Sequence, residues 1–295
     1  MLGPFDRSGY RRHARGFVAA DLDVDLRGRR ALVTGATSGI GYAVADALVA
    51  RGATVALVSR DQRRGEEAQA RLLRAHPGAR VELRRVDVSA LAEVRRFCAD
   101  EPGPLDAIVH AAGVLATTRH LTADGLETSF ATHVAGPHLM TSLLAPRLRL
   151  GARVVFVASG LMYLVRLRLD DLDWSRRAYD GLLAFAHSKR MVAVLAELWA
   201  DRLGPGASVY AMHPGWADTP MVSTGLPRLH RLTRRFLRSA AEGADTIVWL
   251  ASRARPPTPT GALFFDRAPA RATFLPWTRE REGARAALVA ALDRL

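Results

Sequence analysis

The chain has 295 residues, of which 49% are hydrophobic and 24% are charged, a balance typical of a globular protein long enough to bury one large core. Its single cysteine, Cys98, excludes an internal disulfide, and no apolar run reaches the roughly 20 residues that cross a bilayer. The N-terminal residues 1–17 carry charges but no apolar signal-peptide core, so we expect a cytoplasmic protein.

The chain is strongly basic, with a formal net charge of +13, and Lys189 is the only lysine among 42 basic residues. Such a charge predicts either a solvated basic exterior or an anionic partner such as a membrane surface or a phosphorylated ligand. The sequence has neither zinc-ligand spacing nor a nucleic-acid-binding motif, so we expect no metal site and no nucleic-acid partner.

From residue 29 onward, short β-branched runs alternate with helical stretches. The predicted strands are residues 31–35, 54–59, 81–86, 105–110, 153–159, 208–213 and 262–265. Strands that alternate with helices form right-handed βαβ units around a parallel sheet. The sequence therefore predicts an α/β fold: a single doubly wound Rossmann-type domain, with a mostly parallel sheet of about seven strands and helices on both faces.

Three segments make up the chain in this interpretation. Residues 1–27 precede the first strand and form an N-terminal arm. Residues 28–266 contain the alternating strands and helices, including a segment at about 220–240 that is placed to cover a ligand. Residues 267–295 are a C-terminal extension that ends in a predicted helix.

The first strand leads into TGATSGIG, residues 34–41, which opens a helix. Gly35 permits a tight turn, Gly39 lets the backbone approach a pyrophosphate, and Gly41 allows close packing of helix on strand. The N–H groups and partial positive charge of the helix N-terminus then favour phosphate. Because this motif stands between a strand and a helix, it predicts a dinucleotide site rather than a glycine-rich turn.

The end of the second strand distinguishes the two nicotinamide dinucleotides. An acidic residue there usually binds a free ribose 2′-OH, but this chain has Ser59 followed by Arg60. A guanidinium suits a 2′-phosphate, so NADP is preferred over NAD. Asp61 is adjacent, so NAD remains an alternative cofactor. The alternative for Arg60 is a surface charge that binds no ligand.

Several motifs together resemble the short-chain dehydrogenase/reductase family, in order and spacing, over residues 28–265. They are TGATSGIG, Asp87-Val88, HAAG at 110–113, Ser159, HSK at 187–189 and HPGWADT at 213–219. The resemblance implies NAD(P)-dependent hydride transfer between nicotinamide and a carbonyl or alcohol carbon. In the family a Ser holds the substrate oxygen and a Tyr transfers the proton. A Lys four residues later binds the nicotinamide ribose and lowers the pKa of the Tyr, an Asn holds a relay water, and the subunits often form homo-oligomers.

The resemblance assigns cofactor contacts to fifteen positions. They are Gly35, Thr37, Ser38, Gly39, Ile40, Gly41, Arg60, Asp87, Val88, Ala112, Gly113, Lys189, Pro214, Gly215 and Thr219. The family's usual Asn beside Ala112 is Ala111 here.

The catalytic positions depart from the family pattern. Ser159 and Lys189 match, but Phe185 takes the Tyr position and His133 takes the Asn position. Phe185 has no hydroxyl and cannot transfer a proton. Two other residues could supply one: His133, whose pKa suits acid–base work, and Tyr163, four residues after Ser159; the alternative for Tyr163 is an apolar packing role.

The predicted substrate side is apolar. Residues 161–169 are mostly hydrophobic, and residues 226–238 place four apolar side chains on one helical face and arginines mostly on the other. Those apolar residues are Leu229, Leu232, Phe236 and Leu237. This pattern favours a lipid-like or polycyclic carbonyl or alcohol as substrate. A basic amphipathic helix could also rest on an anionic membrane as a peripheral contact, or pack its apolar face on the core.

Two functions follow from these residues. The first is an NADP-dependent oxidoreductase of apolar carbonyls or alcohols with atypical proton delivery, favoured by Ser159 and Lys189. The second is an NADP-binding sensor or scaffold that has lost catalysis, favoured by Phe185.

Overall fold

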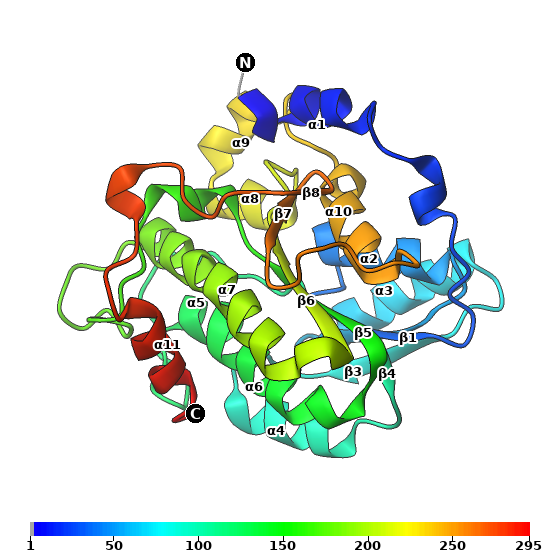
Figure 1. Ribbon diagram of the computed structural model, residues 1–295, viewed down its shortest axis with the longest axis horizontal. Helices are drawn as coiled ribbons and strands as arrows, with labels where there is room; N and C mark the ends of the chain where they lie inside the picture. The colour runs from blue at the N-terminus through cyan, green and yellow to red at the C-terminus, as the bar shows by residue number, and fades with distance from the viewer. Residues whose placement is uncertain (1–2) are drawn as a thin grey trace.

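A computed structural model of the protein describes residues 3–295 and places an eight-stranded sheet at its centre (Figure 1). The strands are β1 (Arg30–Thr34), β2 (Thr54–Ser59), β3 (Val81–Arg85), β4 (Leu105–His110), β5 (Leu148–Val157), β6 (Ala207–Met212), β7 (Leu263–Phe265) and β8 (Ala268–Pro269). Their order across the sheet is β3-β2-β1-β4-β5-β6-β7-β8, and every neighbouring pair is parallel except β7 and β8. The predicted doubly wound α/β fold is confirmed, and the two-residue β8 is the strand that the sequence did not predict.

The helices form a layer on each face of the sheet. They are α1 (Arg7–Ala14), α2 (Gly39–Val49), α3 (Gln62–Ala75), α4 (Leu91–Asp100), α5 (Thr128–Phe130), α6 (Gly136–Leu144), α7 (Gly181–Leu203), α8 (Pro220–Gly225), α9 (Pro227–Thr233), α10 (Ala240–Ser252) and α11 (Ala284–Leu292). A π-helical turn, Ala131–Ala135, joins α5 to α6. Figure 1 shows α4, α6 and α7 on one side of the sheet and α2, α3 and α10 on the other.

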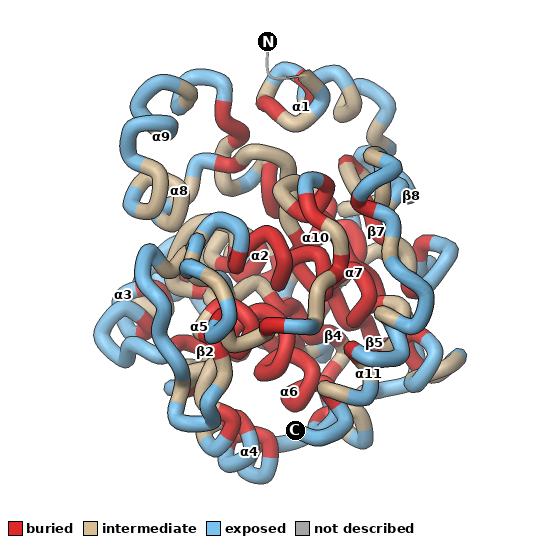
Figure 2. The backbone as a smooth tube through the Cα atoms, turned by 90° about the vertical axis from the view of Figure 1, so that its left-hand side faces the viewer, coloured by how far each residue is buried: buried red, intermediate tan, exposed pale blue. Residues whose placement is uncertain are grey.

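Each face of the sheet has its own hydrophobic core, because β-branched strands buried on both sides present apolar side chains to both helical layers. One core joins the strands to α4, α6 and α7 and includes Leu288 and Leu292 of α11. The other joins them to α2, α3 and α10. In Figure 2 the buried segments gather around the sheet, whereas α1 and α9 project from one end of the molecule and are largely exposed. Among the described residues, no helix is both long and apolar enough to traverse a bilayer.

The sheet topology positions a crevice at the carboxyl ends of the central strands. From β1 the chain passes to α2 on one face, and from β4 it passes to α5 and α6 on the other face. The adjacent loops after β1 and β4 therefore diverge, which is where open α/β sheets bind their ligands.

The N-terminal arm is fastened to the segment around residues 214–238. A buried ion pair joins Arg238 to Asp266, with nitrogen–oxygen distances of 2.5 and 2.8 Å. The same guanidinium donates to the carbonyls of Pro4 and Asp6, at 2.9 and 3.2 Å. The arginines of residues 226–238, Arg238 among them, were predicted to lie mostly on the polar face of an amphipathic helix. The Arg238 side chain is instead buried, because it links three separate chain segments.

We expect Arg238→Ala to lower the free energy of unfolding by about 3–5 kcal/mol, since it leaves Asp266 buried without its guanidinium. Urea denaturation would measure the change. Arg74→Ala, on the exposed side of α3, is the matched control and should stay within about 0.5 kcal/mol of the wild type. Equal effects of the two substitutions would contradict a structural role for the buried pair.

Candidate functional site

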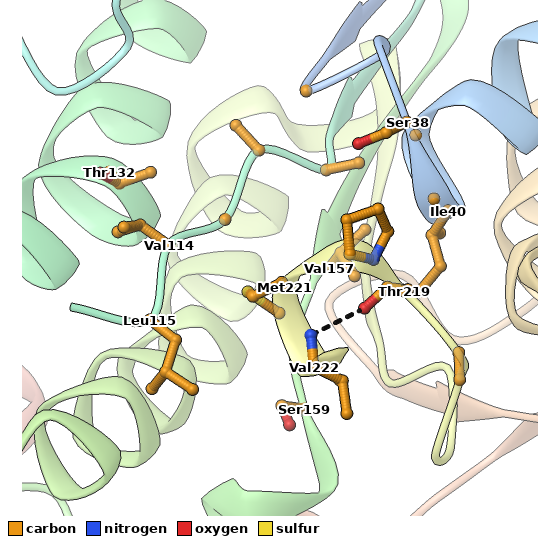
Figure 3. Close-up of a pocket in the computed structure, with 18 of the residues that line it drawn as sticks. Ser38, Ile40, Val114, Leu115, Thr132, Val157, Ser159, Thr219, Met221 and Val222 are labelled. Atoms are coloured by element: carbon orange, nitrogen blue, oxygen red, sulfur yellow. Dashed lines mark hydrogen bonds between the residues drawn. The ribbon is translucent and has the colours of Figure 1, made fainter. Parts of the chain in front are cut away.

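A cavity of about 440 Å³ opens at the carboxyl ends of the central strands, and Figure 3 shows part of its lining. All fifteen predicted cofactor positions line it, as do Ser159 and Phe185. These residues come from the loops after β1 through β6 and from α7, so only the folded sheet brings them together.

The phosphate loop has the close backbone contacts that its glycines predict. Gly35 has a φ of +67°, and a Cβ atom there would lie 2.7 Å from the Cα of Ala112. A Cβ atom at Gly41 would lie 2.4 Å from the carbonyl oxygen of Gly35. Ser38, the N-cap of α2, makes no side-chain capping hydrogen bond. The first N–H groups of α2 therefore remain suited to an external acceptor, and the loop fits a dinucleotide pyrophosphate.

Two arginines border the cavity beside β2. Arg60 and Arg64 both line it, the second being a residue that the sequence analysis did not single out. The neighbouring Asp61 carboxylate accepts a hydrogen bond from the Arg64 backbone N–H at 3.0 Å and caps α3. Asp61 also lines the cavity, so one capping carboxylate lies beside two guanidinium groups that could pair with a ligand phosphate.

Lys189 lies at the opposite end of the cavity, buried on α7. Its ammonium donates a hydrogen bond of 2.7 Å to the Val157 carbonyl at the end of β5. Burial lowers the pKa of Lys189 to about 7, so its charged and neutral forms are both accessible near neutral pH. The ring centre of Phe185, which also lines the cavity, is 5.7 Å from Nζ of Lys189.

Ser159 and Phe185 lie on facing elements. Ser159 follows β5, and its hydroxyl accepts a hydrogen bond of 3.4 Å from the Leu161 N–H. Phe185 is on α7, one turn before Lys189, and is 5% exposed. The spacing of four residues places Phe185 and Lys189 on the same face of the helix, as the sequence predicted.

His133 does not line the cavity, contrary to its predicted role as a proton carrier. Its Nε2 accepts a hydrogen bond of 3.0 Å from the Val114 N–H, so Nδ1 carries the proton and donates to the Ser188 hydroxyl at 2.8 Å. Burial, together with Lys189, holds the pKa of His133 well below its usual value. Both ring nitrogens are thus engaged, and the histidine is a structural link between the loop after β4 and α7.

Tyr163 is also directed away from the cavity. Its ring contacts Phe5, His213 and Phe274, and its hydroxyl is buried without a hydrogen-bond partner among the described residues. Burial raises its pKa, which makes the hydroxyl a poor proton donor at neutral pH. The packing alternative for this residue is therefore confirmed.

The segment after β6 crosses the cavity as two short helices rather than one long amphipathic helix. Thr219 caps α8 through a hydrogen bond from the Val222 N–H, drawn in Figure 3. Met221 and Val222 line the cavity between the phosphate loop and Ser159. These two residues could not be identified from the sequence, because α8 is too short to give a helical periodicity.

The sequence model of the short chain dehydrogenase family matches residues 29–227 of this chain. That range contains the phosphate loop, Ser159 and Lys189. The chain belongs to the short-chain dehydrogenase family. The family resemblance inferred from the motifs is therefore correct.

Known members of the family match most of this chain. Dehydrogenase/reductase SDR family member 12 of Bos taurus is 40% identical over 94% of this chain and 89% of its own. Retinol dehydrogenase 12 of Homo sapiens is 34% identical over 76% of this chain and 73% of its own. A crystal structure of a short chain dehydrogenase from Burkholderia cenocepacia J2315 in complex with NADP superposes with a TM-score of 0.62 at 27% identity, covering 77% of this chain and 91% of that one.

Lys189→Met should change how the stability of this protein depends on pH. Because burial lowers the folded-state pKa of Lys189 to about 7, below its unfolded value, the cost of burying the ammonium is fully present below pH 7. That cost is lost as pH rises towards 10, so wild-type stability should rise relative to Lys189→Met by roughly 1.4 kcal/mol per pH unit in this window. Urea denaturation of both proteins across this range measures the difference, and a constant difference would contradict the buried ammonium.

Proposed function

We propose that the protein is an NADP(H)-dependent oxidoreductase that interconverts an apolar carbonyl compound and its alcohol. The observation that carries the proposal is the convergence of the phosphate loop, Ser159 and Lys189 on one cavity at the carboxyl edge of the sheet. A family member that had kept only its fold would not need a polar side chain aimed at the substrate end.

NADP is the cofactor that the charged lining favours. Arg60 and Arg64 border the cavity where the fold brings the adenosine ribose, and Asp61 caps α3. Two guanidinium groups favour a 2′-phosphate through charge-assisted hydrogen bonds. The phosphate loop would hold the pyrophosphate, Asp87 and Val88 the adenine, and Pro214, Gly215 and Thr219 the nicotinamide amide.

Bound NADPH would supply the hydride, and the side chains of this chain would supply position and the proton. Ser159 would donate a hydrogen bond to the substrate oxygen. We take Phe185 to occupy the position at which the family places its tyrosine, so the proton must come from elsewhere. Neither His133 nor Tyr163 lines the cavity, and both ring nitrogens of His133 are occupied, which leaves the Lys189 ammonium, acting through a water molecule in the space that Phe185 leaves without a hydroxyl. The neutral amine would then regain its proton from solvent.

The substrate end of the cavity is apolar. Leu161, Leu182, Leu226 and Leu229 line it together with Met221. Such a lining favours an extended hydrocarbon or polycyclic substrate with a single carbonyl group, because the apolar area removed from water drives binding. The retinol dehydrogenase relative, by its name, acts on an alcohol of this apolar class.

Phe185 supports a second function, an NADP-binding sensor or scaffold without turnover. A missing acid or base typically costs about 10²–10⁴-fold in rate. The two functions differ in whether the wild-type protein transfers hydride at all, which makes single-turnover measurements decisive.

NADPH should bind more tightly than NADH, and Arg60→Ala should remove most of that preference, because the 2′-phosphate loses a charge-assisted partner worth about 1.5–3 kcal/mol. Isothermal calorimetry with both nucleotides measures the preference. Arg74→Ala, on the same helix as Arg64 but outside the cavity lining, is the control. Tighter binding of NADH, or an unchanged preference in Arg60→Ala, would count against NADP as the cofactor.

Phe185→Tyr should raise the single-turnover rate of NADPH oxidation with apolar aldehydes and ketones by about 10²-fold or more, since it supplies a positioned hydroxyl. In the wild type, the rate should fall as pH rises above about 7, because the Lys189 ammonium is then lost. Lys189→Arg should bind NADPH but not reduce the substrate, because arginine does not release its proton. A wild-type rate independent of pH between 6 and 9 would contradict proton delivery by Lys189.

A further inference from the structure

Helix α9 exposes apolar side chains for which the sequence left three roles open: covering an apolar substrate, contacting an anionic membrane, or packing on the core. Leu232 is 75% exposed, Leu229 is 42% exposed and Phe236, just beyond the helix, is 41% exposed. Leu237 alone of the predicted apolar face is buried. Large apolar side chains gathered on one projecting segment indicate a surface that contacts another body.

The same segment carries positive charge without compensating acids. Residues 219–241 contain no Asp or Glu, and Arg228, Arg231, Arg234 and Arg235 are exposed. Within the part of the chain that the structure describes, none of these four arginines forms an ion pair, although most other arginines of the lid and arm region do, such as Arg7 and Arg238. The free guanidinium groups are therefore available to an anionic partner.

The N-terminal arm extends this surface. The Arg7 N–H donates a hydrogen bond of 2.9 Å to the Phe236 carbonyl, so α1 begins where the α9 segment ends. Arg12 and Arg15 are exposed along the arm. Figures 1 and 2 both place α1 and α9 at the same end of the molecule.

This surface is continuous with the mouth of the cavity. Leu229 is exposed yet also lines the cavity, and Leu226 and Thr233 of the same segment line it as well. A molecule held against the outer side of α9 would therefore lie next to the entrance of the apolar substrate end.

The charge of the surface distinguishes between its partners. A second copy of this chain would bring one cluster of unpaired arginines against another, and this repulsion opposes self-association through the surface. A bilayer that contains anionic lipids offers phosphates to the arginines and hydrocarbon to the leucines at the same time.

We propose that α9 and the adjoining α1 dock on an anionic membrane surface, with Leu229, Leu232 and Phe236 entering the headgroup boundary and the exposed arginines binding lipid phosphates. Docking in this orientation places the cavity mouth at the bilayer, from which an apolar substrate would enter. Only this entry route rests on the proposed oxidoreductase function; the docking itself does not.

The test is sedimentation of the full chain with vesicles of phosphatidylcholine alone or with about 30 mole per cent phosphatidylserine, in about 0.1 M salt. We expect binding to the anionic vesicles and release at about 0.5 M salt, where screening shortens the range of the arginine charges. Leu232→Ser combined with Phe236→Ser, and separately Arg231→Glu combined with Arg234→Glu, should each weaken binding by about tenfold or more. None of these four residues lines the cavity.

Leu73→Ser combined with Arg74→Glu is the matched control, because Leu73 is 41% exposed and both residues lie on α3, away from the docking surface. Thermal unfolding of each variant establishes that it folds. Equal binding to the two vesicle types, no binding to either, or equal losses in control and test variants would overturn the proposal. So would a dimer, seen by light scattering, that dissociates in the Leu232 and Phe236 variant.

Discussion

The hydrogen bond from the buried Lys189 ammonium to the Val157 carbonyl joins α7 to the end of β5, and the substrate end of the cavity depends on it. It fixes α7 in the rotation that brings Phe185 into the cavity lining, where its ring packs edge-on against His133 of the π-helical turn. A buried lysine with one carbonyl partner costs folding free energy. Under the proposed function, the charge and the proton of Lys189 account for its retention at this cost.

The loop after β1 imposes the second constraint. Gly35 and Gly41 allow the backbone of α2 to approach β1 and the loop after β4 more closely than any side chain would permit. This part of the site could be predicted from the sequence because a strand, a glycine motif and a helix are contiguous and depend on local geometry. The Lys189 and Phe185 pair was predictable for the same reason, since two positions four residues apart share a helical face.

Other features could not be predicted because they depend on tertiary contacts. Arg238 was assigned to a solvated face, but its partners, Asp266 and the arm carbonyls, are remote in sequence. The position of His133 suited a proton carrier, yet the surrounding N–H and hydroxyl groups occupy both of its ring nitrogens. The exposure of Leu232 follows from the break between α8 and α9, which turns the second helix outward and which periodicity alone does not reveal. Tertiary contacts therefore decide which of the predicted residues line the cavity and which lie outside it.

The most direct test of the account is isotope transfer by the wild-type protein. NADPH carrying deuterium on the reactive nicotinamide carbon would be incubated with decanal and other apolar aldehydes and ketones, and the alcohols examined by mass spectrometry. If Lys189 supports turnover, we expect deuterium on the carbinol carbon with wild-type protein and none with Lys189→Met. Bound NADPH without deuterium transfer by the wild type, together with transfer by Phe185→Tyr, would contradict it and establish the protein as a nucleotide-binding member of the family that has lost catalysis.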